Sequence, residues 1–147
     1  MNHTKRRNGI FVASFLFVAV SAAVLFLSAP DAANAATDGW HIKDDTTGGE
    51  CTLIGNWDAA NKTCTLSQDL SQGIIIDSNH IIFDGNGHTI TGSNTGDGVS
   101  LGKTNVMITS VMIKNLNVVR FSYGIAIYSG GNIVTNSTAS NNFTGIT

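Results

Sequence analysis

Short apolar runs that begin with glycine recur along the second half of the chain. Three of them have the pattern Gly-apolar-x-apolar, and a fourth begins just before the last residue. The runs begin at Gly73, Gly98, Gly124 and Gly145. A period in the twenties is typical of a solenoid, in which each repeat buries its apolar face only against the neighbouring repeats.

Each of the first three runs leads to a turn that contains asparagine and then to a second apolar segment. These second segments are residues 80–83, 106–108 and 133–134. Their Ile and Val favour strands, and the intervening Asn and Gly tolerate the left-handed backbone of tight corners. A leucine-rich repeat would show Leu-x-x-Leu-x-Leu and a helical half instead. The sequence therefore predicts an all-β parallel β-helix of about three coils over residues 73–147.

Residues 36–72 do not repeat. They contain both tryptophans, Trp40 and Trp57, and most of the acidic residues. Because the end of a solenoid exposes unpaired strand edges, we expect this segment to be an N-terminal cap. No matching cap follows the repeats, and a new strand begins at Gly145, so we expect the repeats to be truncated at the C-terminus.

Residues 1–35 have the pattern of a secretory signal peptide. A cationic patch at residues 5–7 precedes an apolar run from Ile10 to Leu27, and Ala33-Asn34-Ala35 forms a small-x-small cleavage site. The apolar run is also long enough to span a bilayer, so an uncleaved membrane anchor is the alternative. Contact with a membrane is predicted only in that case. Either route predicts a secreted, periplasmic or cell-surface protein.

Cys51 and Cys64 are the only cysteines of the chain. An exported chain meets an oxidising compartment, which favours a structural disulfide between them. The alternative is a metal or redox pair, but the spacing is not C-x-x-C and no histidine lies between the two residues. We therefore predict a Cys51–Cys64 bond within the cap.

The charge balance limits the kinds of partner. The chain has 8 Lys+Arg and 10 Asp+Glu, and charged residues make up 12% of it. This excludes the basic footprint of a nucleic-acid-binding protein, so no nucleic-acid partner is predicted. The composition also argues against a nucleotide-binding α/β enzyme and against a coiled coil.

The residues from Gly73 onward resemble exported right-handed parallel β-helix proteins, a group that includes NosD-like periplasmic proteins and many surface-protein repeats. Residues 84–92 (DGNGHTITG) look like the first-coil motif of that group, and residues 49–66 resemble the disulfide-containing segment that often precedes it. The resemblance implies a right-handed coil. It does not imply one activity, because the group includes lyases, hydrolases, epimerases and non-catalytic modules.

Enzymes of this fold that cleave polysaccharides place several carboxylates on adjacent coils. After residue 69 the acids are Asp77, Asp84 and Asp97. When the repeats are aligned on their glycines these three fall in different columns, and Asp84 aligns with Thr109. No stacked pair of acids results, so the sequence predicts no catalytic residues.

The same resemblance raises the question of copper. His80, His88, Met107 and Met112 are ligand types that copper accepts, but their spacing forms no recognisable cluster. We expect the methionines to pack in the structure, and we predict no metal site and no cofactor.

Three aromatic residues flank one coil: Phe121, Tyr123 and Tyr128. They either form a surface for stacking sugars or cover the edge of the core. Together with Asp97 they are the candidate ligand surface. We predict an exported or cell-surface, non-catalytic module that contacts polysaccharide or another surface protein. We also expect that the chain can associate with itself through the open C-terminal coil. The alternative is the N-terminal fragment of a polysaccharide lyase or glycoside hydrolase whose active-site coils lie beyond residue 147.

Overall fold

The computed structural model describes residues 38–147 except 103–104. The predicted signal peptide, residues 1–35, lies outside the described residues. No helix among the residues described is long and apolar enough to cross a membrane. The prediction of an all-β chain is confirmed there, since thirteen strands are accompanied by a single four-residue helix, α1 (Cys51–Ile54).

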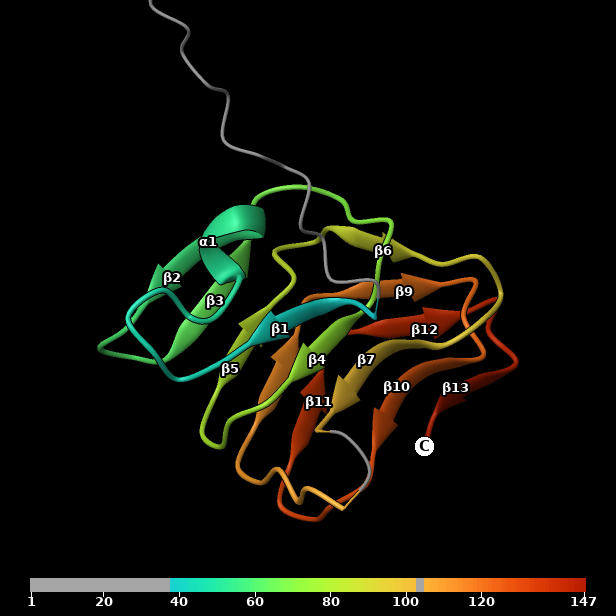
Figure 1. Ribbon diagram of the computed structural model, residues 1–147. Helices are drawn as coiled ribbons and strands as arrows, with labels where there is room; N and C mark the ends of the chain where they lie inside the picture. The colour runs from blue at the N-terminus through green and yellow to red at the C-terminus, as the bar shows by residue number, and fades with distance from the viewer. Residues whose placement is uncertain (1–37, 103–104) are drawn as a thin grey trace, which may run out of the picture. The chain divides into compact units, whose positions relative to one another are not determined.

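The strands form three sheets (Figure 1). Sheet A consists, in spatial order, of β1 (Trp40–Ile42), β4 (Ile74–Ile76), β7 (Asp97–Leu101), β10 (Tyr123–Ile127) and β13 (Thr144–Ile146). Sheet B consists of β2 (Gly55–Asp58), β3 (Thr63–Leu66), β5 (Ile82–Asp84), β8 (Met112–Lys114) and β11 (Ile133–Thr135). Sheet C consists of β6 (Thr89–Thr91), β9 (Asn117–Val119) and β12 (Thr138–Ser140).

From β4 onward the chain visits the sheets in the order A, B, C three times before it returns to sheet A with β13. Every strand pair is parallel except β2–β3. Leu101 is in register with both Ile76 and Ile127, so these three residues form one stack along sheet A. The glycine-led runs therefore mark successive strands of sheet A.

The core lies between the three sheets and is made mainly of short β-branched and aliphatic side chains. Sheet A contributes Ile74 and Leu101, sheet B contributes Phe83, and sheet C contributes Ile90 and Val118, all of them fully buried. Three-residue strands suffice because each one pairs with a strand on the next turn of chain as well as the previous one. Stability thus comes from stacking between turns of chain rather than from long strands.

The corners between sheets are formed by residues with a left-handed backbone, which recur from one turn to the next. Between sheets B and C these residues are Asn86, Asn115 and Asn136, with φ of 51°, 54° and 46°. Asparagine tolerates this conformation better than most residues. The Asn136 side-chain amide donates a hydrogen bond to Asn115 Oδ1 at 2.6 Å, so the asparagines also link successive turns.

The segment predicted as a cap does more than cover an end. Its strands β1 and β3 pair in parallel with β4 and β5, so they form the first rungs of sheets A and B. Antiparallel β2 covers the outer edge of β3, and the predicted Cys51–Cys64 disulfide is present, joining α1 to β3. The sheet orders put this end opposite β13, as Figure 1 shows.

One strand lies at a different place from the one that the sequence predicts. Residues 106–108 are not a strand; the second strand of this repeat is β8, Met112–Lys114. The connection that precedes β8 covers residues 102–111, whereas the equivalent connections cover only 77–81 and 128–132. Because of this longer connection, Asp84 is in register with Lys114 rather than with Thr109.

The methionines do not behave uniformly. Met107 lies in the long connection and is 74% exposed, so the expectation that it packs in the core is wrong. Met112 is half-buried on β8. Residues 106–108 have the apolar residue types of a strand. In the structure, however, the run that follows them, Met112–Lys114, is the one that pairs with β5 and β11.

Candidate functional site

The outer face of sheet A carries the polar and aromatic side chains of the candidate site. On β7, Val99 and Leu101 are fully buried in the core, and Ser100 between them faces the other way, into a groove. On β10, Ile125 is buried like Val99, Ala126 is in register with Ser100, and Tyr123, the first residue of the strand, is exposed. Tyr128 follows β10 immediately and is 60% exposed.

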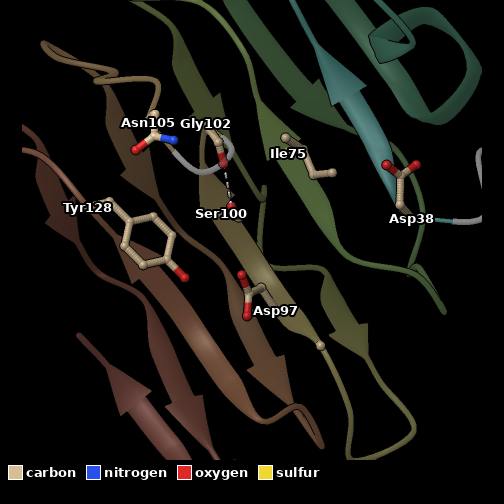
Figure 2. A pocket seen from close by; sticks show the side chains of 8 residues that line it. Asp38, Ile75, Asp97, Ser100, Gly102, Asn105 and Tyr128 are labelled. Atoms are coloured by element: carbon tan, nitrogen blue, oxygen red, sulfur yellow. Dashed lines mark hydrogen bonds between the residues drawn. The ribbon is translucent and has the colours of Figure 1, made fainter.

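The groove on this face has a volume of about 530 Å³. That volume is within the range of small-ligand sites. Its lining combines acidic, hydroxyl, amide and aliphatic groups from four segments: Asp38, Ile75, Gly96, Asp97, Ser100, Gly102, Asn105 and Tyr128. Figure 2 shows these side chains, with the Tyr128 ring and the Asp97 carboxylate on neighbouring strands.

Asp97 and Tyr128 face each other across the groove. The Tyr128 hydroxyl and the Asp97 carboxylate point toward each other (Figure 2). Burial raises the pKa of Asp97 above its usual value, although the Tyr128 hydroxyl opposes this shift. Burial also raises the pKa of Tyr128, and the nearby Asp97 charge raises it further. The pair is thus a carboxylate and a neutral phenol under mutual electrostatic influence.

A second carboxylate lines the groove. Asp38 lies two residues before Trp40, which is in register with Ile74 and, through it, with Val99. Asp97 is the first residue of β7, and β4 lies between β1 and β7 in sheet A. The alignment of the repeats did not include Asp38, because this residue belongs to the segment before them.

A histidine lies beside the groove on the same face. His41 Nδ1 is 2.5 Å from Asp77 Oδ2, and His41 Nε2 is 3.5 Å from Asp38 Oδ1. Each ring nitrogen of His41, which is on β1, therefore faces a carboxylate: that of Asp38, two residues before β1, and that of Asp77, the residue after β4. These contacts hold the imidazole in one orientation, with His41 between Asp38 and Asp77.

The structure divides the predicted ligand surface. Asp97, Tyr123 and Tyr128 lie on the outer face of sheet A, and Asp97 and Tyr128 line the groove. Phe121 is only 5% exposed and packs in the core cluster. It therefore covers the core, the alternative role considered for these aromatic residues, and does not offer a ring to a ligand.

The residues considered as copper ligands are not brought together. His88 Nδ1 contacts Asp69 Oδ1 at 3.1 Å, His80 occupies a corner with φ of 62°, and Met107 is in the exposed connection before β8. Across residues 38–102 and 105–147, no group of three or more His, Cys, Asp or Glu side chains is placed to hold a metal ion.

The sequence pattern did not identify three residues that lie in or beside the groove: Asp38, His41 and Ser100. The alternation Trp-His-Ile at residues 40–42, three residues like the Ile-Ile-Ile of β4, was the signal that another strand of sheet A precedes the repeats. No family model, curated protein or solved structure matches this chain.

Proposed function

We propose that the chain is a right-handed parallel β-helix of the exported, NosD-like and surface-repeat type. The repeated A, B, C order with parallel pairing supports this fold. Connections between parallel strands of one sheet are right-handed in nearly all proteins, which favours that hand. The signal-peptide pattern of residues 1–35 and the Cys51–Cys64 bond favour a secreted, periplasmic or cell-surface location.

The proposed function is that of a non-catalytic module that contacts polysaccharide through the groove on sheet A. The observation that carries it is the pairing of an exposed ring, Tyr128, with the carboxylate of Asp97 in a groove of about 530 Å³. Sugars present apolar C–H faces that stack on aromatic rings, and hydroxyl groups that donate to carboxylates. Ile75, buried in the floor, and Ser100 complete an amphipathic lining of this kind.

Affinity electrophoresis in gels that contain soluble polysaccharides tests the proposal. We expect at least one polysaccharide to retard the purified chain and the Tyr128→Ala variant to migrate faster in the same gel. Phe143→Ala is the matched control, because Phe143 is 91% exposed and lies outside the groove. Equal retardation of the parent and Tyr128→Ala, or no retardation by any polysaccharide, would contradict the proposal.

A second candidate, a polysaccharide hydrolase, is favoured by the two carboxylates, Asp38 and Asp97, that line the same groove. Glycosidases use such a pair of carboxyl groups as acid and base or nucleophile. Assays of product release from polysaccharides distinguish the two functions. Release that disappears in Asp97→Asn supports the hydrolase, and binding without release supports the module.

A further inference from the structure

We propose that the polysaccharide bound on sheet A runs along β10, in the direction of the strands, and that Tyr123 is a second position at which a sugar ring stacks. The proposal rests on the proposed function, because it extends the same surface beyond the groove. The ligand class that it names is a linear chain of several sugars, whose successive rings offer their C–H faces to the protein.

Two exposed tyrosines mark the two ends of β10. Tyr123 is the first residue of this strand and is 40% exposed, and Tyr128 directly follows the strand and is 60% exposed. Asp97 on β7 is in register with Tyr123, and its carboxylate and the Tyr128 hydroxyl point toward each other (Figure 2). Asp97 therefore neighbours both tyrosines. A chain that crossed the strands would meet one of these rings only, whereas a chain that follows β10 meets both.

The stack of strands does not require an aromatic ring at either position. On the neighbouring strands, the residues in register with Tyr123 are Asp97 and Thr144. Ile127 is in register with Leu101, and the residue that follows β7, at the place of Tyr128, is Gly102. Because small or polar residues fill both positions on adjacent strands, the two exposed rings of β10 are available for a ligand that stacks on them.

The part of β10 between the two tyrosines leaves space for a flat ligand. Ile125 is buried in the core, and Ile127 packs against it. Ala126 lies between them, has a single methyl group as its side chain and is in register with Ser100 of the groove. Of residues 124–127, all of which the structure describes, none raises a long side chain from the outer face of the sheet. A sugar chain can therefore pass from one ring to the other.

The hollowed surface also follows the direction of the strands. The groove includes residues that come after the strands, such as Gly102 and Tyr128. A second hollow of about 400 Å³ includes residues that come before the strands, such as Ser93 and Thr95, and it shares Asp97 with the groove. The serine and threonine hydroxyls of the second hollow can both donate to and accept from the hydroxyl groups of a sugar. A chain laid along β10 would thus continue from the groove into a hydroxyl-lined hollow.

Isothermal titration calorimetry of the full exported chain with cello-, xylo- and manno-oligosaccharides of two and six sugars tests the proposal. We expect at least one series to bind, with the six-sugar member about tenfold tighter than the two-sugar member, because it reaches both rings. Tyr123→Thr should remove most of this gain and leave the two-sugar member unchanged. Thr144 fills the same position on the next strand, so we expect this variant to fold. Tyr123→Phe should keep the gain, since stacking needs the ring and not the hydroxyl.

Ile133→Thr is the matched control, because Ile133 is 54% exposed and lies on β11 of sheet B. It should leave both affinities unchanged, and a loss as large as that of Tyr123→Thr would overturn the inference. If Tyr123→Thr keeps the gain of the longer ligand, or weakens both ligands equally, Tyr123 is not a second position and the inference is overturned. The proposed function then still stands if Tyr128→Ala weakens binding. Binding of no oligosaccharide overturns the linear chain, and retardation in gels with soluble polysaccharides decides separately on the proposed function.

Discussion

Asp84 and Lys114 lie directly opposite each other on β5 and β8, and their side chains form an ion pair of 3.0 Å. The Asn115 amide donates a second contact to Asp84 Oδ1 at 2.9 Å, and the backbone N–H of Asn86 donates a third. Burial alone would raise the pKa of Asp84, but these hydrogen bonds and the Lys114 charge outweigh it and lower the pKa. The carboxylate thus connects two successive turns of chain at a corner of the stack.

We expect Asp84 to make stability depend on pH. Its folded pKa lies below the unfolded value of 3.8, so its contribution is present above pH 3.8 and is lost as the pH falls through the lowered pKa. Asp84→Asn should lower the free energy of unfolding at pH 7 by about 1 kcal/mol. The difference from the parent should shrink toward acid pH in urea titrations. Lys43→Gln, at an exposed position, is the control, and a constant difference at every pH would argue against this linkage.

The inner stack of sheet A should be the most sensitive part of the core. Leu101 is fully buried between Ile76 and Ile127, and its truncation to alanine leaves a cavity that neighbouring short strands cannot fill. Leu101→Ala should lower the free energy of unfolding by about 2–5 kcal/mol. The same substitution at Leu53, which is 64% exposed, should change it little. Similar thermal melts for the two variants would show that the register is wrong.

The register of sheet A was predictable because the glycine that precedes each run has a steric role. A Cβ added to Gly98 would lie 2.2 Å from Val118 Cγ1 and 2.6 Å from the Gly124 carbonyl oxygen. At Gly98 and Gly124 a Cβ would meet side chains of sheet C, those of Val118 and Ala139, so these glycines mark where sheet C lies close to sheet A. Sheet B has no such marker, and the connection over residues 102–111 brings Lys114, five residues after the expected Thr109, into register with Asp84.

Gly98→Ala should consequently be destabilising, by about 1–3 kcal/mol, because one of the crowding atoms is backbone and has little room to move. Gly130→Ala is the matched control. A Cβ at Gly130 has no atom within 4 Å, so that variant should be neutral, or stabilised by about 0.4–1 kcal/mol through the unfolded state. Chemical denaturation of both variants provides the comparison, and equal midpoints would contradict the close packing at Gly98.

The candidate site was predictable only in part, for a related reason. Asp97, Tyr123 and Tyr128 belong to the repeats, and the sequence groups them because the aromatic residues flank one coil. Asp38 and His41 precede the repeats. The segment Gly39-Trp40-His41-Ile42 has the same Gly-apolar-x-apolar pattern, but Gly39 lies 34 residues before Gly73, whereas the later glycines are 21–26 residues apart. The burial of Phe121 depends on which side of a corner its ring points, and the spacing of residues along the chain does not determine that.

The disulfide should contribute strongly to the stability of the N-terminal end. It closes a loop with a sequence separation of 13, for which chain entropy predicts a contribution of about 3 kcal/mol. The double substitution Cys51→Ser and Cys64→Ser should therefore lower the denaturation midpoint by a corresponding amount. Intact mass of exported protein with and without reductant checks that the bond forms, and an N-terminus near Ala36 would support the predicted cleavage site. Two free thiols in exported protein would contradict the prediction.

Asp97→Asn tests whether the ionised Asp97 carboxylate lowers the stability of the folded protein. The raised pKa of Asp97 means that the folded protein disfavours its ionised form, so the penalty is absent below the unfolded value of 3.8 and develops as the pH rises through the folded pKa. Asparagine removes the charge and keeps an oxygen that faces the Tyr128 hydroxyl. The variant should therefore be as stable as the parent at pH 7, or more stable by up to about 0.5 kcal/mol, and the difference should vanish near pH 3. Thermal melts of both proteins across this pH range measure the difference. A clear loss of stability at pH 7 would show instead that the Asp97 carboxylate stabilises the corner before β7.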